Sequence, residues 1–236
     1  MTGAGEVNVQ RMLYAVGDIH GEIQKLDELL EELPLVAGDE LVFLGDYIDR
    51  GPDPFAVVER LIQLQREWPC VFLLGNHESM LLDFLGWTDD AYFGGDAFLM
   101  NGGDRTLASY GYFDREKPDR HGFRLPRHHE DFLLSLKLHY LKGDYAFVHA
   151  GFGRAQLRQT DLDYAFRKSK PEDLLWSRVT CDLPHRFGVT LVYGHTPSED
   201  FQVRWNLPFS IGVDTGAVYG GPLTAIRLPD ETIFQV

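Results

Sequence analysis

Between Met12 and Leu85, a short apolar run, a polar turn and an amphipathic segment follow one another three times. The apolar runs have the length of buried strands, and the amphipathic segments place apolar residues at helical spacing. This succession predicts an α/β fold, in which ligands bind at the carboxyl ends of the strands. All three polar turns lie at such ends. The apolar runs are Met12 to Val16, Leu41 to Leu44 and Val71 to Leu74.

The rest of the chain shows two further patterns. Residues 79–137 are rich in glycine and aromatic residues and include two segments with helical spacing, 104–110 and 130–138. We interpret this region as an inserted helical cap, because no linker separates it from the second half of the chain, and we expect residues 1–236 to form a single domain. From residue 138 the pattern is mostly that of β-strands. The expected strands are 138–141, 145–149, 189–193, 201–204, 209–213, 223–227 and 232–234.

Charge and composition restrict the partners and the location of the protein. The 36 acids and 22 bases give a formal net charge of −14, which disfavours nucleic acid and anionic membranes as general partners. No apolar run approaches the ~20 residues that span a bilayer, and the first ten residues do not resemble a secretory signal. Cys70 and Cys181 follow no disulfide or metal-binding spacing. We therefore expect a soluble, cytoplasmic protein.

Five predicted strand ends share a small residue beside a His, Asp or Asn. They are Gly17-Asp18-Ile19-His20-Gly21, Gly45-Asp46, Gly75-Asn76-His77-Glu78, His149-Ala150-Gly151 and Gly194-His195. One such tract has little meaning, but five are difficult to attribute to loop composition. They offer nitrogen and oxygen ligands without a thiolate, which favours Mn²⁺, Fe or Zn²⁺ in a catalytic role. Six ligands suit two ions that share one carboxylate.

The second of these tracts continues with more charge. The run Gly45-Asp46-Tyr47-Ile48-Asp49-Arg50-Gly51 places two carboxylates and a guanidinium at the end of a buried strand. Taken alone, it predicts a site for a cation, an anion, or both.

The ordered set of tracts resembles the calcineurin-like metallophosphoesterases, and within them the phosphoprotein phosphatase family, with its GDxHG, GDxVDRG, GNHE, HAG and later GH motifs. The resemblance extends from about residue 12 to the C-terminus and is nearest to the compact bacterial and phage phosphatases. It implies a central sandwich of mixed β-sheets flanked by helices. It also implies two divalent metal ions, Mn²⁺ first among the candidates, and hydrolysis of phosphoserine or phosphothreonine by a hydroxide that bridges them.

The resemblance also implies a role for each matching residue. Asp18, His20 and Asp46 would hold one ion, and Asp46, Asn76, His149 and His195 the second. His77 would be the general acid, oriented by Asp49, and Arg50 would bind phosphate. Arg178, in the tract Trp176-Ser177-Arg178, is a weaker match to a second phosphate-binding arginine.

Three alternatives to a serine/threonine phosphatase remain open. Dinucleoside tetraphosphate hydrolases belong to the same superfamily, although they usually lack the Asp-Arg pair found here at Asp49-Arg50. Tyrosine and small-molecule phosphoesters also remain possible, because Leu74 stands where the eukaryotic enzymes have arginine and their long C-terminal segment is missing. A phosphate-binding module without catalysis is disfavoured, because all the matching residues are present. The sequence gives no oligomeric state.

Other notable residues have simpler interpretations. We expect the five remaining histidines to be surface or loop residues, and the tract Asn101-Gly102-Gly103-Asp104 to be a turn and helix cap, with a substrate-groove role as the lesser alternative. Asp214 belongs to a family tract near the metal centre but is not expected to be a ligand. The aromatic cluster Trp87, Tyr92, Phe93 and Phe98 is predicted to form the core of the cap. The five histidines are His121, His128, His129, His139 and His185.

Overall fold

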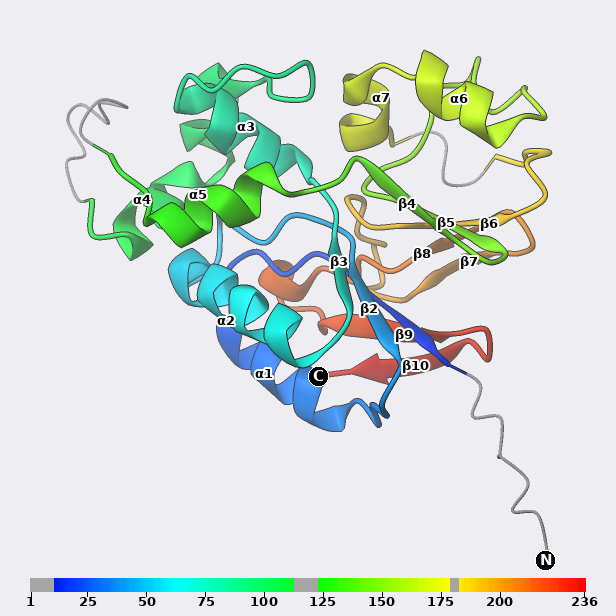
Figure 1. The fold of residues 1–236 in the computed structure, drawn as a ribbon, viewed down its shortest axis with the longest axis horizontal. Coiled ribbons are helices and arrows are strands. Elements are labelled where there is room, and N and C mark those ends of the chain that lie inside the picture. Colours follow the sequence, from blue (N-terminus) through cyan, green and yellow to red (C-terminus); the bar gives the residue numbers. More distant parts are fainter. Residues whose placement is uncertain (1–10, 113–122, 179–182) are drawn as a thin grey trace, which may run out of the picture.

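Two five-stranded sheets pack face to face, with helices covering both outer surfaces (Figure 1). The computed structural model describes residues 11–112, 123–178 and 183–236. In the first sheet, strands β1, β2 and β3 are parallel and β9 and β10 antiparallel, in the order β10-β9-β1-β2-β3. Their bounds are β1 Leu13–Val16, β2 Glu40–Phe43, β3 Cys70–Phe72, β9 Thr224–Leu228 and β10 Thr232–Gln235. This is the mixed-sheet α/β sandwich that the sequence predicts.

The second sheet has the order β4-β5-β6-β8-β7. It begins with the expected antiparallel hairpin and continues with parallel pairs from β5 to β6 and from β6 to β8. Its strands are β4 His139–Lys142, β5 Tyr145–Val148, β6 Thr190–Tyr193, β7 Arg204–Asn206 and β8 Ser210–Gly212. The helices are α1 Ile23–Glu32, α2 Pro54–Glu67, α3 Asn76–Phe84, α4 Gly103–Ser109, α5 Arg127–Leu134, α6 Leu162–Lys168 and α7 Pro171–Trp176. Three short 3₁₀ helices are η1 Gly95–Ala97, η2 Leu99–Asn101 and η3 Ala217–Tyr219.

Strands β1 and β5 are continuously apolar because both of their faces are buried. In β1, Ala15 packs into the core between the sheets, whereas Tyr14 and Val16 pack toward the helices. In β6, Val192 belongs to the same inter-sheet core and its neighbours face α6 and α7. This alternation is the two-residue period of a strand.

The cap shares its core with the first sheet. Phe98, Leu107 and Phe132 of residues 79–137 belong to the same buried cluster as Tyr14 and Phe43. Phe98, a member of the predicted aromatic cluster of the cap, is fully buried. Its other three members, Trp87, Tyr92 and Phe93, are partly buried and pack against the core cluster that contains Phe98. The assignment of residues 1–236 to a single domain stays a prediction.

Several expected boundaries were wrong. Helix α5 ends at Leu134, because Lys137 already pairs with Leu73 at the edge of the first sheet. The strand expected at 201–204 is β7, at Arg204–Asn206, because Phe201 has a φ of 56° and packs in a turn. Helices α6 and α7 lie in a half of the chain that was expected to be mostly β, and they cover the outer face of the second sheet.

Two further observations concern the length of the helices and the cysteine side chains. Within the described ranges, no helix is both long and apolar enough to cross a membrane. Cys70 is an unpaired, half-buried thiol, and burial raises its pKa to about 12. It therefore carries no reactive thiolate at neutral pH, as expected for a small core residue. Cys181 lies outside the described residues.

Candidate metal centre

The loops that follow β1 and β2 are held together by backbone hydrogen bonds. The amides of Ile19 and His20 both donate to the carbonyl oxygen of Asp46, at 3.1 and 2.9 Å, and the amide of Gly21 donates to that of Tyr47 at 2.8 Å. Because parallel strands end at one edge, the turns after β3, β5 and β6 meet these loops there. All six predicted metal ligands are buried at this edge.

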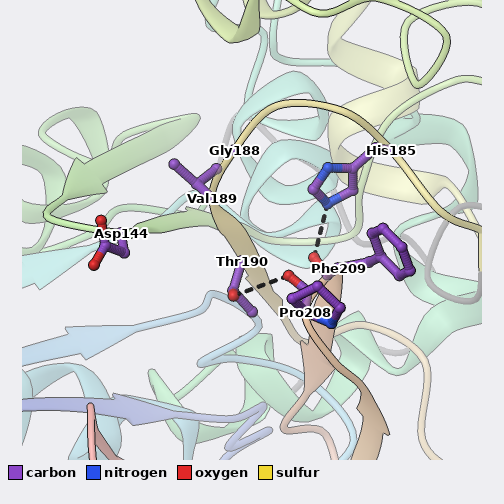
Figure 2. Close-up of a pocket in the computed structure, with 7 residues that line it drawn as sticks. All are labelled: Asp144, His185, Gly188, Val189, Thr190, Pro208 and Phe209. Atoms are coloured by element: carbon purple, nitrogen blue, oxygen red, sulfur yellow. Dashed lines mark hydrogen bonds between the residues drawn. The ribbon is translucent and has the colours of Figure 1, made fainter.

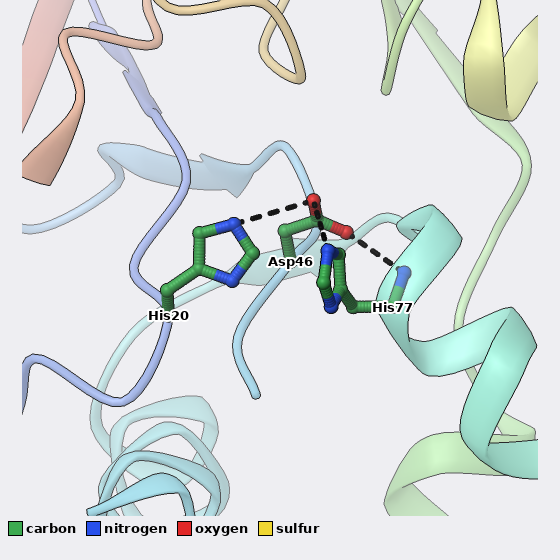
Figure 3. Close-up of side chains that lie close together, drawn as sticks. All are labelled: His20, Asp46 and His77. Carbon is green, nitrogen blue, oxygen red and sulfur yellow. Dashed lines mark hydrogen bonds and ion pairs between the residues drawn. The ribbon is translucent and has the colours of Figure 1, made fainter. Parts of the chain in front are cut away.

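Asp46 lies at the centre of the cluster. Its carboxylate is 3.5 Å from His20 Nε2 and 3.4 Å from His149 Nε2, and His77 Nε2 is 4.0 Å away. Figure 3 shows His20 and His77 on either side of this carboxylate. Burial alone would raise the pKa of Asp46, but the surrounding imidazoles, led by His149, hold it well below its ordinary value. Asp46 is therefore ionised, as the predicted bridging ligand must be.

Two histidines are oriented by backbone carbonyls. His20 Nδ1 lies 2.8 Å from the Ile48 oxygen, and His149 Nδ1 lies 2.7 Å from the Leu44 oxygen. A carbonyl oxygen can only accept, so both Nδ1 atoms carry hydrogen and both Nε2 atoms present a lone pair. Burial lowers the pKa of each ring, which keeps it neutral. A neutral imidazole oriented through its second nitrogen is a typical metal ligand.

Asn76 and His195 complete the second side of the cluster. The amide oxygen of Asn76 is 3.1 Å from His149 Nε2 and 2.9 Å from His195 Nδ1. Asn76 is the first residue of α3, so this ligand belongs to a helix and not to the loop that the sequence pattern indicated. His195 Nε2 is buried and has no hydrogen-bond partner among the described residues.

Asp18 accepts the His195 amide on both carboxylate oxygens, at 3.1 and 3.0 Å. Asp214 lies beside it, and burial raises the pKa of both acids, that of Asp214 to about 6. Asp214 belongs to the environment of the cluster, and sequence reasoning placed it only near the metal centre.

The donor set fits two cations. Two overlapping triplets, His20-Asp46-His77 and Asp46-His149-His195, each bring three ligand atoms within 4.8 Å of one another. Both contain Asp46, which agrees with a shared carboxylate, but the first contains His77, the predicted general acid, in place of the predicted ligand Asp18. The excess of buried oxygen and lone-pair nitrogen is electrostatically unfavourable without a positive charge. That Asp18, His20, Asp46, Asn76, His149 and His195 bind metal stays a prediction.

The predicted acid and its partner form a buried pair. His77 Nδ1 is 2.6 Å from Asp49 Oδ2, and His77 Nε2 has no hydrogen-bond partner among the described residues. Burial lowers the pKa of His77, but the carboxylates of Asp46 and Asp49 outweigh that effect and hold the pKa above its ordinary value. Thr106 of α4 donates its hydroxyl to Asp49 Oδ1 and accepts the Asp49 amide at 3.0 Å. No sequence signal identified Thr106.

The Glu78 carboxylate fixes the turn after β2 by accepting hydrogen bonds from its backbone amides. It accepts the amides of Asp46, Tyr47 and Ile48, at 3.0, 2.8 and 3.2 Å, and that of Gly75 at 3.1 Å. Burial raises its pKa, and the amide hydrogen bonds oppose the rise. Glu78 belongs to the GNHE tract, so the signal was present, but no role was derived for it.

The backbone of the site is strained. Seven non-glycine residues in the described ranges have positive φ, and five of them are predicted site residues: His20, Asp46, Asp49, Arg50 and His195. Such conformations cost about 1–3 kcal/mol each and persist where the surrounding structure imposes them. At His20 and Asp46, hydrogen bonds between the loops and to Glu78 hold the backbone. The amides of Asp49, Arg50 and His195 instead donate to Thr106, Gly102 and Asp18.

The two predicted phosphate-binding arginines differ in placement. Arg50 Nη1 lies 2.7 Å from His20 Nε2, so Arg50 donates to a nitrogen that a cation would take, and its guanidinium also lies 5.6 Å from the ring of Tyr219. Its amide donates to the Gly102 oxygen at 3.2 Å, so the Asn101–Asp104 turn supports this arginine as well as starting α4. Arg178 is exposed, close enough to lower the pKa of His149 and His195.

The remaining histidines are not all on the surface. His129 is buried within α5, which corrects the expectation for it. His185 is also buried but lies in the loop before β6, as expected of a loop residue. His128 is about half exposed, and His139 of β4 stacks on Phe166. His185 lines a cavity of about 240 Å³ near the start of β6 (Figure 2). His195 follows the other end of that strand. His185 bonds the Phe209 oxygen at 2.7 Å and stacks on Phe187, a structural role. His121 lies outside the described residues.

The two-sheet α/β sandwich gathers His, Asp and Asn side chains at one strand edge, an arrangement suited to metal-dependent hydrolysis of phosphoesters. The profile of the Calcineurin-like phosphoesterase family matches residues 12–221. The chain belongs to this family of hydrolases, which use two divalent metal ions, and the buried clusters around Asp46 are suited to hold them.

The chain is similar to relatives of two kinds. The chain is 28% identical to the asymmetrical bis(5'-nucleosyl)-tetraphosphatase PrpE of Oceanobacillus iheyensis, over 94% of this chain and 90% of that protein. It is 30% identical to serine/threonine-protein phosphatase 1 of Salmonella typhimurium, over 92% of each. Among solved structures, a provisionally assigned diadenosine tetraphosphatase superposes with a TM-score of 0.66 at 26% identity, over 97% of this chain and 94% of the other. The family is thus shown, and the substrate is not.

Proposed function

We propose that this protein hydrolyses phosphomonoesters of phosphoproteins, with phosphoserine and phosphothreonine as the main substrates. The observation that carries the proposal is the buried pair of His77 and Asp49, with Nδ1 and Oδ2 2.6 Å apart. A serine or threonine alkoxide is a strong base and leaves only with a proton, whereas the phosphate leaving group of a dinucleotide leaves without one. A preserved general acid is therefore more useful against an alkyl ester.

Each part of the site has its own task in this reaction. When bound, two divalent ions, for which we propose Mn²⁺, would clamp the phosphoryl group and lower the pKa of a water molecule. Arg50 would bind the phosphate oxygens, because its planar guanidinium matches their geometry. A cation on His20 Nε2 would replace the present hydrogen bond from Arg50 and release the guanidinium for this role. His77 would donate the proton on Nε2 to the leaving oxygen, while Asp49 keeps the ring in place.

Hydrolysis of dinucleoside tetraphosphates is the second candidate. It is supported by the similarity to PrpE over 94% of the chain and by the TM-score of 0.66 to a protein assigned to that activity. Tyrosine phosphoesters form a third, weaker possibility. We further infer a cytoplasmic location, because the two cysteines follow no disulfide spacing. We infer neither nucleic acid nor membrane as a partner, because the charge of −14 repels anions.

The deciding experiment compares substrates on one preparation. Metal-stripped protein, with and without added Mn²⁺, is assayed on phosphoserine, phosphothreonine and phosphotyrosine peptides and on diadenosine tetraphosphate. We expect no turnover without metal and the highest kcat/KM on the phosphoserine or phosphothreonine peptide. A clear preference for the dinucleotide would replace the proposal with the second candidate. Full activity of stripped protein in chelator would refute dependence on a dissociable metal.

A further inference from the structure

A second group of metal-binding side chains lies outside the strand-end cluster. Glu59 lies in the middle of α2, and His128 and His129 are the second and third residues of α5. The three belong to helices that pack against each other, one beside the first sheet and one in the cap (Figure 1). None of them has a role in the proposed hydrolysis.

Both imidazoles point at one carboxylate oxygen. Glu59 Oε1 is 2.6 Å from His128 Nε2 and 3.0 Å from His129 Nε2, and the three ligand atoms all lie within 4.8 Å of one another. Zinc binds such atoms at about 2.0–2.2 Å, so two ligands of a tetrahedral ion are roughly 3.3 Å apart. The two separations from Glu59 Oε1 are close to that spacing, and an ion could enter with small movements of Glu59 and His128, which are 30% and 49% exposed.

The buried member of the group is held in position. His129 is inaccessible to water, and its Nδ1 lies 2.7 Å from the hydroxyl of Tyr110. The rings of Phe55 and Tyr110 pack against it, with centroids 4.9 and 5.5 Å away. A hydrogen bond on the second ring nitrogen and a rigid apolar wall are common features around metal-binding histidines. His128 is half exposed, which leaves water access to the fourth position of a tetrahedral ion.

The protonation states agree with this geometry. The hydrogen bond from His128 lowers the pKa of Glu59, and burial lowers that of His129. An ionised carboxylate and a neutral imidazole are the forms that bind a metal. Two nitrogen ligands and one oxygen suit Zn²⁺ better than the oxygen-preferring Mg²⁺ or Ca²⁺.

We propose that Glu59, His128 and His129 form a third metal site, which binds Zn²⁺ and ties helix α5 of the cap to helix α2. The ion would have a structural role, separate from the two ions of the catalytic centre. The site is independent of the substrate, because none of its three ligands has a role in the proposed hydrolysis.

The test counts ions in the full-length protein. Metal-stripped wild type, His128→Ala and Glu59→Gln are incubated with excess Zn²⁺ and desalted, and the zinc per chain is measured by mass spectrometry. His139→Ala serves as the matched control, because it removes a histidine of β4 that stacks on Phe166 of α6 and is not one of the three proposed ligands. We expect both cluster variants to hold one ion fewer than wild type, and the control to hold the same number as wild type.

A second measurement separates loss of the ion from loss of folding. Far-ultraviolet circular dichroism verifies each variant, and thermal unfolding is recorded with and without Zn²⁺. The rise in Tm caused by Zn²⁺ should be smaller in both cluster variants than in the control. Equal zinc content in wild type and the folded cluster variants would overturn the proposal. Failure of catalysis on every substrate would not affect it, because neither readout depends on turnover.

Discussion

His77 Nδ1 lies 2.6 Å from Asp49 Oδ2, and both side chains are almost completely inaccessible to water. The contact is a charge-assisted hydrogen bond, and it fixes the ring so that Nε2 faces the Asp46 carboxylate. A proton on Nε2 is thus directed toward the metal cluster, where a bound phosphoester would lie. Without Asp49, the ring would lose both its orientation and its nearest negative charge.

Replacement of Asp49 by Asn is expected to affect substrates according to their leaving groups. Turnover of a phosphoserine peptide should fall by roughly 100-fold or more, the contribution typical of general acid catalysis. Turnover of p-nitrophenyl phosphate should fall much less, because p-nitrophenolate leaves without a proton. The two rates are measured on Mn²⁺-loaded protein of verified metal content. An equal loss on both substrates would indicate a general distortion and not a missing acid.

Thr106 is expected to act as a positioning residue for the same pair. Its hydroxyl contacts both the carboxylate and the amide of Asp49, whose φ is 70°. Thr106→Val keeps the shape but leaves the buried carboxylate without this donor, at a cost of about 1–3 kcal/mol. We expect roughly tenfold slower turnover of phosphoserine peptide and a smaller loss on p-nitrophenyl phosphate. Thr106→Ser should restore the wild-type ratio, and failure of that rescue would count against a hydrogen-bonding role.

The residues that would carry out the chemistry could be predicted from the sequence, whereas the residues that hold them in position could not. Asp18, His20 and Asp46 could be found because strand ends in an α/β sheet meet at one edge, and this follows from local pattern alone. Thr106 could not be found, because its contact with Asp49 spans 57 residues and depends on how the cap packs. The burial of His129 has the same origin, since helix α5 packs against α2 and Tyr110 only in the folded chain.

The fold, like the site, could be predicted only in part from the sequence. Runs that are buried on both faces, such as Tyr14 to Val16, are apolar throughout and easy to detect. Helices α6 and α7 were missed because they are short, with few buried residues each, such as Ala165 and Leu174. The positive φ angles of Asp46 and Asp49 have no sequence signal, because tertiary hydrogen bonds impose a conformation that these residue types do not prefer.

Two glycines allow a controlled test of the support for Arg50. Gly102 has φ +94°, and an added Cβ would lie 2.8 Å from Arg50 Cγ and 2.9 Å from its amide nitrogen. Gly111 has a similar φ of +82° and nothing within 4 Å of an added Cβ. Both alanine variants carry the cost of an unfavourable φ, about 1 kcal/mol, but only Gly102→Ala displaces Arg50. We expect KM for phosphoester to rise several-fold in Gly102→Ala alone, and equal KM values would contradict the contact.

The pair of Asp18 and Asp214 leads to a prediction about metal-free protein. Burial raises the pKa of Asp214 from its ordinary value of 3.8 to about 6. A group whose folded pKa is raised contributes stability at acid pH, and that contribution is lost as the pH rises from about 4 to about 6. Asn at position 214 carries no charge and undergoes no such loss, and its side-chain oxygen can still accept the Gly216 amide that Asp214 binds at 3.0 Å.

Asp214→Asn is therefore expected to stabilise the metal-free protein at pH 7.5 by at most ~3 kcal/mol, because the folded pKa of Asp214 lies about two pH units above its ordinary value. The substitution should have little effect at pH 4.5. Urea unfolding in chelator at the two pH values measures this, with the exposed Asp90→Asn as control. Added Mn²⁺ should reduce the difference in unfolding free energy between Asp214→Asn and wild type at pH 7.5, because a cation beside Asp18 offsets the charge that the substitution removes. A difference that is the same at both pH values would show that Asp214 is not protonated in the folded, metal-free chain.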